Sequence, residues 1–357
     1  MNLLTRLFPT PSFVRIPTVG LDFSDATMRF VSLSITPKGL LPHRFAEMSI
    51  PEGAMKGGRI VDTQKFVAFL KTVQSQHHLR YVHVSIPESQ VYSVTLSLDA
   101  ATEKDIRGAI ELVLEDNIPL KVVETVFDYH ILSQTDSVIV VQVVAMASSV
   151  ADAYYAAFTE AGIIPVSFEL EGQAISRAVL PPEDTGSYMI VDFGANRTGI
   201  SIVTHGTAMV TATLDFGGKI LTQTLAKELN VSLEEAEKMK REKGLSGVGG
   251  EKQVFSILST SLSVLKDEIN RRYIYWQERK NQSGDFPRIE KIYLCGGHSN
   301  LEGLDEYLSA SLKIPVQQVN PWVNCFSVDE VIPSLTKEIS MSYVTAIGLA
   351  LADFIYD

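Results

Sequence analysis

The sequence predicts an α/β protein built from two related lobes, with a small α+β insert. Strand-like and helix-like segments alternate along most of the chain, which favours α/β architecture over an all-α or all-β fold. Its 357 residues exceed what one simple core usually holds. Two hairpins about 170 residues apart, VGLDFSDATMRFVSL and MIVDFGANRTGISIV, share an apolar run, Asp-Phe, a tight turn and a return strand. This repetition indicates two related halves.

The first half begins with two strands in residues 18–35, around a turn at Ser24 to Ala26. A helix with apolar residues at helical spacing follows in 62–76, and then a strand in 81–87. After Pro87 the order strand, helix, strand, strand, helix predicts a compact insert. Asp99 and Thr102 offer N-caps for its first helix, which Pro119 ends.

The second half begins at the second hairpin. Two helices are expected in 217–244, with Ser232 as the N-cap of the second. A longer helix over 254–280 carries a core-facing apolar stripe that needs no functional explanation. The predicted division is 1–87 and 164–186 for the first lobe, 88–163 for the insert, 187–225 and 289–338 for the core of the second lobe, 226–288 for its helical subdomain, and 339–357 for a C-terminal helix returning to the first lobe.

Composition excludes several classes of protein. A net charge of -11 argues against broad nucleic-acid binding, which needs a basic face. Two cysteines, Cys295 and Cys325, cannot build a disulfide framework or a metal cluster, which fits a reducing, cytoplasmic compartment. No apolar run reaches the roughly 20 residues of a membrane-spanning helix. The start, MNLLTRLFPTPSF, does not resemble a signal peptide; it reads as a loose terminus or a short amphipathic tether.

Two aspartates, Asp22 and Asp192, each end a predicted buried strand just before a turn. A buried carboxylate needs a cation or several donors, so the pair predicts a divalent ion, bound directly or through water. Asp capping its own turn is the alternative. After each aspartate the turn presents backbone N–H groups, and Gly194 would let a phosphate approach closely. Arg197 or Thr198 could add a side-chain donor.

Glycine pairs complete the pattern. Gly217 and Gly218 open a helix, and the late strand in YLCGGHSNLEGL ends at Gly296 and Gly297. Turn chemistry alone would explain such glycines; a backbone platform for a flat ligand is the other reading. The order of hairpin, helix, hairpin, Gly-Gly helix and late Gly-Gly turn resembles the actin-like ATPase superfamily, which includes sugar kinases, heat-shock 70-type chaperones and FtsA.

Within that superfamily the chain is similar to the PilM family of type IV pilus assembly proteins. Four stretches carry the resemblance: ELVLEDNIPLKVVETVFDYHIL, FELEGQAISRAVL, GGKILTQTLAKELNVSLEEAEKMK and SYVTAIGLALAD. With the nucleotide motifs they span nearly the whole chain. The resemblance implies an actin-like fold of duplicated ribonuclease H-like domains, with ATP and Mg²⁺ held between two facing turns, one from each lobe.

The resemblance also assigns roles to residues. Glu171 would help to orient the hydrolytic water, or else simply begins a helix, where the dipole favours Glu. Glu237 and Lys240 match positions near ribose and adenine; their alternative is a solvated helix face with i, i+3 charge pairs. The implied nucleotide-binding residues are Asp22, Ser24, Asp192, Gly194, Arg197, Thr198, Gly217, Gly218, Glu237, Lys240, Gly296 and Gly297, with Asp192 and Asp22 near Mg²⁺.

One departure from the family pattern concerns the first turn. Ser24 replaces a glycine, and Asp25 brings a carboxylate near the expected phosphates. Two like charges a few ångströms apart cost on the order of 4 kcal/mol near a protein surface. Unless Asp25 points outward or meets the metal, we expect weak ATP binding or slow hydrolysis, so at most a weak ATPase.

The resemblance implies a partner as well. PilM-like proteins bind the cytoplasmic N-terminal peptide of the inner-membrane protein PilN, in a groove beside the insert. Candidate groove residues are Tyr92, Ile118, Phe127 and Tyr129, although most alternate residues of strands are simply core. The protein would then work at the inner face of the cytoplasmic membrane, with self-association open and no nucleic-acid partner. An FtsA-like filament-forming division protein and a small-molecule kinase of the same superfamily are the alternatives.

Overall fold

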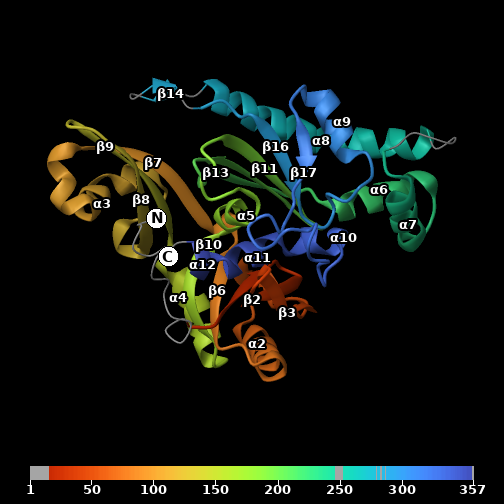
Figure 1. The fold of residues 1–357 in the computed structure, drawn as a ribbon, viewed down its shortest axis with the longest axis horizontal. Coiled ribbons are helices and arrows are strands. Elements are labelled where there is room, and N and C mark those ends of the chain that lie inside the picture. The colour runs from red at the N-terminus through yellow and green to blue at the C-terminus, as the bar shows by residue number, and fades with distance from the viewer. Residues whose placement is uncertain (1–15, 246–251, 279, 282–283, 286, 356–357) are drawn as a thin grey trace. The chain divides into compact units, whose positions relative to one another are not determined.

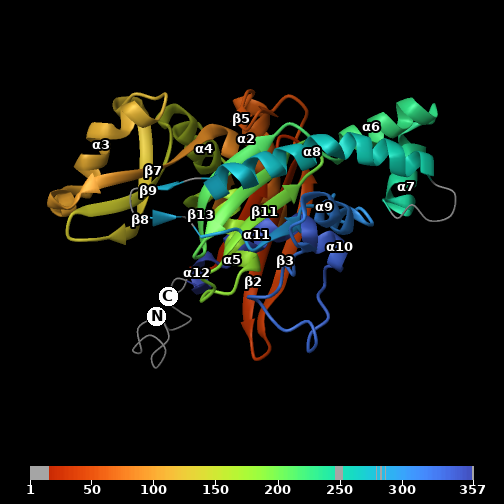
Figure 2. The same ribbon diagram turned by 90° about the horizontal axis from the view of Figure 1, so that it is seen from above.

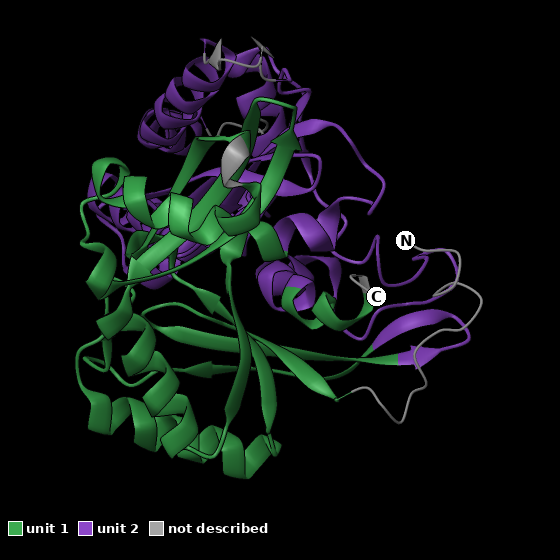
Figure 3. Cartoon of the chain, turned by 90° about the vertical axis from the view of Figure 1, so that its left-hand side faces the viewer, with its two compact units in different colours: residues 1–34, 42–174, 349–357 green, residues 35–41, 175–348 purple. Residues whose placement is uncertain are grey.

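The computed structural model describes residues 16–245, 252–278, 280–281, 284–285 and 287–355. The chain divides into two compact units, drawn in green and purple in Figure 3. Unit 1 comprises residues 1–34, 42–174 and 349–357, and unit 2 comprises residues 35–41 and 175–348. The leucines of the predicted N-terminal tether lie outside the described residues.

The elements alternate along the chain as the sequence predicts (Figure 1). The first part holds β1 (Thr18–Phe23), β2 (Thr27–Thr36), β3 (Gly39–Ser49), β4 (Met55–Lys56), β5 (Arg59–Ile60), α2 (Thr63–His77), β6 (Tyr81–Ile86), β7 (Val91–Asp99), α3 (Ile106–Asn117), β8 (Thr125–Gln134), β9 (Val138–Ala147), α4 (Ser148–Glu160), β10 (Ile164–Leu170) and α5 (Glu171–Val179). The second part holds β11 (Ser187–Phe193), β12 (Thr198–Thr204), β13 (Thr207–Leu214), α6 (Gly218–Leu229), α7 (Leu233–Lys243), α8 (Lys252–Glu278), β14 (Lys280–Asn281), β15 (Gly284–Asp285), β16 (Lys291–Cys295), α9 (Leu304–Leu312), β17 (Val316–Gln318), α10 (Lys337–Ser340), α11 (Val344–Ala350) and α12 (Ala352–Ile355).

The main sheet of unit 1 has five strands in the order β10-β6-β1-β2-β3. Strand β1 runs antiparallel to β2 and parallel to β6, which in turn is parallel to β10. Helix α2 begins at the N-cap Asp62, and its predicted stripe of Phe66, Val67, Leu70 and Val73 is buried. These side chains join residues of β1, β2, β6 and α4 in one hydrophobic core.

A second, three-stranded sheet in unit 1 has the order β7-β9-β8 and packs against α3 around its own core (Figure 2). The order β7, α3, β8, β9, α4 matches the predicted insert. Helix α4 differs from the prediction, because its buried residues Tyr154, Ala157 and Phe158 belong to the core of the five-stranded sheet. The buried side of α4 thus packs on the main core of unit 1, and the extent of the insert, 88–163, stays a prediction.

The predicted N-caps of α3 are wrong. Asp99 ends strand β7, and a turn of 3₁₀ helix occupies residues 100–105. Asp105 caps the α-helix instead, because its carboxylate accepts a hydrogen bond from Gly108 N–H at 2.9 Å. The helix ends at Asn117, as the following Pro119 predicts.

The sheet of unit 2 has the order β13-β12-β11-β16-β17. Strand β11 is antiparallel to β12, β12 is antiparallel to β13, and β16 is parallel to both β11 and β17. The central strand of each sheet, β1 or β11, has an antiparallel neighbour on one side and a parallel neighbour on the other. Two strands lie on each side of it, so the two sheets share one strand order. The topology agrees with the duplication that the paired hairpins predict.

The helices of unit 2 follow the predicted capping and packing signals. Helix α7 begins with a capping box, in which Ser232 and Glu235 bond each other's backbone N–H groups. Helix α8 buries Leu258, Leu262 and Leu265 along one face, as the apolar stripe predicts. None of the helices in the described ranges is both long and apolar enough to cross a bilayer.

The unit boundaries differ from the predicted ones in three segments. Residues 35–41 belong to unit 2, where Leu40 N–H donates to the carbonyl oxygen of Cys325 at 2.8 Å. Residues 175–186 and 339–348 also belong to unit 2 rather than to the first lobe. There the guanidinium of Arg177 donates to the Gly348 carbonyl at 2.8 Å. Such long-range bonds leave no local pattern in a sequence.

Candidate functional site

Both predicted turns exist and are built alike. In unit 1, Ser24 N–H donates to the carbonyl oxygen of Thr27 at 2.8 Å, and in unit 2, Gly194 N–H donates to that of Arg197 at 3.0 Å. Ser24 therefore stands where the second turn has glycine. Its hydroxyl accepts hydrogen bonds from the Thr27 and Ala26 N–H groups at 3.1 and 3.3 Å. The N–H groups of Ala26 and Thr27, which could otherwise bind a phosphate, are thus bonded within the turn.

Asp22 is the last but one residue of β1 and lies beside Ser85 of β6, whose hydroxyl donates to Asp22 Oδ1 at 2.7 Å. Burial raises the pKa of Asp22, and the hydrogen bond from Ser85 and the charge of Arg29 oppose this only partly. A carboxylate in that state gains from a nearby cation, which is the setting expected of a Mg²⁺ site. Ser85 was missed in the sequence because only the pairing of β1 with β6 brings it to Asp22.

The carboxylate of Asp25 is hydrogen-bonded to the protein backbone. Its two oxygens accept the backbone N–H groups of Gly57 and Gly58 at 2.8 and 2.9 Å, in the turn between β4 and β5. Two amide donors stabilise the negative charge locally. The electrostatic objection to phosphate binding that the sequence raises is correspondingly smaller.

Glu171 begins α5 at the carboxyl edge of the unit 1 sheet, where β1, β6 and β10 end together. A second acidic residue at this edge, Glu88, is 7% exposed and accepts Gly172 N–H at 3.1 Å through Oε1. It caps the N-terminus of α5, where a negative charge is favoured. The sequence shows Glu88 only as the residue after Pro87, so its role depends on tertiary structure.

In unit 2, Asp192 of β11 pairs with Cys295 of β16, which places it beside Gly296. Gly296 has φ +86°, and a β-carbon there would overlap Asp192 Oδ1 and lie 2.6 Å from the carbonyl oxygen of Phe193. Glycine is therefore required by the protein's own packing. At Gly297, by contrast, a β-carbon would meet only Ser342 Cβ, at 3.5 Å, so open space adjoins this residue.

The turn after Asp192 caps helix α6. Gly218 N–H donates to the Gly194 carbonyl, and Lys219 N–H to that of Ala195, both at 3.0 Å. Gly217 is the N-cap, and a β-carbon on it would overlap the Ala195 carbonyl. These bonds bring the predicted residues Gly194, Gly217 and Gly218 together and occupy N–H groups that would otherwise face a ligand.

The two predicted side-chain donors of this turn differ. Thr198 is fully buried, and its hydroxyl donates to the Phe216 carbonyl at 2.6 Å. Its proton is therefore used in a bond to the segment between β13 and α6. Arg197 keeps part of its side chain exposed, with Nε 3.9 Å from Asp215 Oδ1. Of the two, Arg197 is the better placed to meet an anion.

Glu237 and Lys240 of α7 reach the same helix N-terminus. Lys240 is 3% exposed, and its Nζ donates to the Gly218 carbonyl, Thr222 Oγ1 and Glu237 Oε2 at 3.1, 2.8 and 2.7 Å. The solvated helix face considered as the alternative is therefore wrong for Lys240. Burial raises the pKa of Glu237, but hydrogen bonds from Lys240, Thr222 and Arg241 outweigh it and bring that pKa to about 2.

His298 is a member of this cluster that sequence reasoning missed. Its backbone N–H donates to the Phe193 carbonyl at 3.0 Å, and its ring lies edge-on to that of Phe193, with centroids 6.0 Å apart. A β-carbon on Gly218 would overlap the ring at Cδ2, Cγ and Nε2. Burial, followed by the charge of Lys240, lowers the pKa of His298 to about 4, so the imidazole is neutral at pH 7.

The described residues thus form one group of predicted site residues in each unit. Unit 1 holds Asp22, Ser24 and Glu171, and unit 2 holds the other ten residues around Asp192, the start of α6 and the turn after β16. Within the described ranges, no three His, Cys, Asp or Glu side chains gather as metal ligands.

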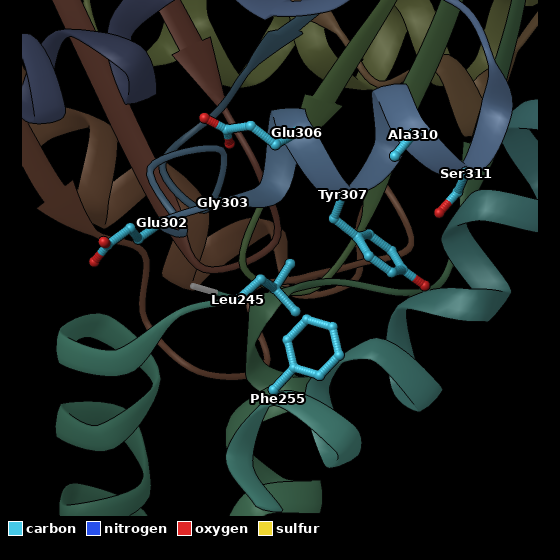
Figure 4. Close-up of a pocket in the computed structure, with 8 residues that line it drawn as sticks. All are labelled: Leu245, Phe255, Glu302, Gly303, Glu306, Tyr307, Ala310 and Ser311. Carbon is cyan, nitrogen blue, oxygen red and sulfur yellow. The ribbon is translucent and has the colours of Figure 1, made fainter. Parts of the chain in front are cut away.

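A separate hollow of about 490 Å³ lies in unit 2 (Figure 4). Leu245, Phe255 and Tyr307 gather in it, while the carboxylates of Glu302 and Glu306 point away from the Phe255 ring. Gly303, at the end of YLCGGHSNLEGL, belongs to its lining. The predicted site residues do not line this hollow, so the two features are distinct.

The candidate groove residues are mostly core. Ile118 and Phe127 are buried in the core of the small sheet, and Tyr129 packs against it. Tyr92 is 38% exposed. Only Tyr92 among the four candidates offers substantial surface to a peptide.

Comparison with known proteins supports the fold. A likeness covering 95% of this chain and 99% of the other, with TM-score 0.75 and 22% identity, is to a structure described as the PilM-PilN type IV pilus biogenesis complex. The ethanolamine utilization protein EutJ from Carboxydothermus hydrogenoformans shows TM-score 0.56 and 18% identity over 96% of this chain and 91% of that one. MreB5 of Spiroplasma citri bound to ADP shows TM-score 0.52 and 15% identity over 87% and 93%.

These likenesses confirm the predicted actin-like α/β fold. A family model described as type IV pilus assembly protein PilM matches residues 20–354, which is nearly the whole described chain. The chain belongs to the PilM family of type IV pilus assembly proteins.

Proposed function

We propose that the protein is a nucleotide-binding adaptor of type IV pilus assembly. The observation that carries the nucleotide part is the convergence, within unit 2, of Asp192, the Gly194 turn, the start of α6 and the turn after β16. Membership of the PilM family supports the role in pilus assembly. The ADP-bound MreB5 structure, which has the same fold, supports an adenine nucleotide as the ligand.

In this proposal the residues of unit 2 divide the ligand between them. Gly297, with open space beside it, would face the nucleoside, and Glu237 and Lys240 would lie near its ribose and adenine. Arg197 would meet a phosphate oxygen from the turn after Asp192. Asp192 would hold Mg²⁺ through water, and the ion would offset the negative charge of the phosphates.

Unit 1 has the corresponding turn after Asp22. Burial raises the pKa of Asp22, and a nearby cation would stabilise the charged form of its carboxylate, which supports the assignment of Asp22 to a cation. Glu171, at the same edge of the sheet, is the candidate to orient a hydrolytic water. The Ser24 hydroxyl already bonds two turn amides, which supports slow hydrolysis or weak binding even though the Asp25 charge is stabilised.

We further propose a PilN-like inner-membrane protein as the partner, bound through its cytoplasmic N-terminal peptide. The likeness to a chain of the PilM-PilN complex supports this choice. Contact with such a partner would hold the protein at the inner face of the cytoplasmic membrane. Titration of a labelled N-terminal peptide, followed by fluorescence anisotropy, tests it; an unchanged anisotropy at high micromolar protein would count against the partner.

Titration with labelled ATP and Mg²⁺ tests the nucleotide site. We expect saturable binding by the natural protein and at least a tenfold loss of affinity for Asp192→Asn, because the carboxylate that orders the hydrated cation is neutralised. Asp267→Asn, at an exposed position of α8 in the same unit, changes the net charge equally and should bind as the natural protein does. No binding at millimolar ATP, or equal losses in both variants, would refute the site.

A further inference from the structure

We propose that His298 controls nucleotide affinity, because its imidazole occupies the place of the nucleoside and must leave before a purine nucleotide can bind. This inference rests on the proposed nucleotide site. It concerns the residue that directly follows the glycine pair Gly296-Gly297, which the sequence pattern leaves unassigned.

The position of the ring carries the inference. The imidazole lies against Gly218, at the first turn of α6, so closely that a β-carbon there would fall inside it. Its other neighbour is the Phe193 ring, with centroids 6.0 Å apart and planes at 64°. The space that glycine leaves open at position 218 is therefore filled by a flat heteroaromatic ring from the protein itself.

The surrounding groups are those assigned to the nucleoside. Lys240, Glu237, Arg241 and Lys219 are the charges that act on the His298 ring. Lys240 and Glu237 are the residues matched to ribose and adenine. Gly297 directly precedes His298 in the chain, and Gly218 lies against its ring. A purine approaching these groups would meet the imidazole first.

The chemistry of the ring explains why it can stand there. Imidazole is the five-membered ring of a purine, so it is flat and can fill the same narrow space. It carries no charge at pH 7, and no counter-ion is needed for burial. By contrast, Lys240 has all three ammonium hydrogens bonded within the protein, to Gly218, Thr222 and Glu237. The imidazole thus fills the space beside Gly218, and the hydrogen bonds of Lys240 are made within the protein.

Displacing the ring has an energetic consequence. The ligand must compete with contacts that the protein already makes, so the apparent affinity is the intrinsic affinity multiplied by the fraction of molecules in which the ring has moved away. Removing the ring should remove this competition. The effect has the opposite sign to that of deleting a ligand-binding side chain, which makes the two roles easy to tell apart.

The test compares Mg²⁺-ATP and Mg²⁺-ADP titrations of the natural protein, His298→Ala and His298→Ser. We expect both variants to bind at least fivefold more tightly than the natural protein. His205→Asn is the matched control, since His205 lies in the exposed turn between β12 and β13 with φ +52°, which Asn tolerates; its affinity should not change.

The outcomes separate this inference from the proposed function. If the natural protein binds nucleotide and both His298 variants bind equally or more weakly, the inference is overturned and the nucleotide site stands. If neither the natural protein nor the variants bind, both fail.

A second measurement needs no nucleotide. Gly218→Ala should lower the urea midpoint of unfolding, because its methyl group displaces the ring. In the His298→Ala background the same change should cost much less; equal costs in both backgrounds would show that the ring does not fill this space.

Discussion

His298 joins three neighbours at once: the Phe193 ring, the Gly218 backbone and the charged pair of α7. Its burial as a neutral base ties the stability of the protein to pH. A base whose pKa is lower in the folded state stabilises the fold fully above its unfolded pKa. As the pH falls, the unfolded chain takes up a proton that the folded chain excludes. The stabilisation is lost between pH 6.5 and about pH 4.

Urea unfolding of the natural protein and His298→Ala at pH 7, 5.5 and 4 measures this effect. We expect the free energy of unfolding of the natural protein to fall by about 1–3 kcal/mol more than that of the variant over this range, since one pKa unit corresponds to 1.36 kcal/mol. His205→Ala, which removes an exposed histidine, serves as the control. Parallel pH curves for all three proteins would contradict the burial of a neutral imidazole.

Residue positions around the site could be predicted, but their environments could not. The i, i+3 spacing of Glu237 and Lys240 indicates a charge pair. It does not indicate that Lys240 is buried, because this depends on contact with another helix, whose Gly218 carbonyl Lys240 bonds. Likewise, a glycine pair indicates close approach, but Gly296 is glycine because Asp192 and Phe193 crowd it. Ser85, Glu88 and His298 escaped prediction because their partners are distant in sequence.

At the level of elements, the β4–β5 hairpin links the turn after Asp22 to the start of β7. Gly57 and Gly58 both have positive φ, as a two-residue type I′ turn requires. Their N–H groups bind Asp25, while the Gly57 carbonyl accepts Gln90 Nε2 at 2.7 Å and Ser89 Oγ at 3.1 Å. Asp25 is therefore a positioning residue for the turn rather than a misplaced charge.

Removing the Asp25 carboxylate should loosen this hairpin. We expect Asp25→Ala to lower the free energy of unfolding by about 1–3 kcal/mol, because the amides of the exposed Gly57 and the buried Gly58 lose a charged acceptor. Amide hydrogen exchange at Gly57 and Gly58 should accelerate at the same time. Asp136→Ala, in the exposed turn between β8 and β9, is the control and should change neither quantity. Unchanged exchange at both glycines would show that the carboxylate does not hold them.

Long periodic elements were predictable, whereas short or tertiary ones were not. The stripes of α2 and α8 and the N-cap Ser232 of α7 are local signals, and each is confirmed. The two-residue strands β4 and β5 are too short to leave a pattern. The N-cap of α3 was misassigned because Asp99 pairs with Val138 in the sheet, which leaves Asp105 to cap the helix.

At the level of the whole molecule, the duplication was predictable and the division into units was not. The same strand order recurs in both sheets, as the repeated hairpins indicate. The boundaries depend on bonds such as that between Leu40 and Cys325, which joins residues far apart in the chain. Unit 1 is also discontinuous: it includes residues 349–357. Within it, Asp353 bonds His83 Nε2 at 3.0 Å and the Thr18 hydroxyl.

Asp353 should therefore stabilise unit 1 from the far end of the sequence. We expect Asp353→Ala to lower the free energy of unfolding by about 1–3 kcal/mol, because the buried His83 loses an acceptor. Asp329→Ala, at an exposed loop position, should leave the unfolding midpoint unchanged. Equal midpoints for the two variants would show that the bond to His83 adds nothing.

The discontinuity of unit 1 bears on how the protein is made. Thr18 is synthesised 335 positions before Asp353, which accepts its hydrogen bond. Domains generally fold as they emerge, N-terminal first. Until α12 has been synthesised, Thr18 of β1 lacks this acceptor, so a chain arrested after residue 348 would hold all of unit 2 while unit 1 still lacked this bond.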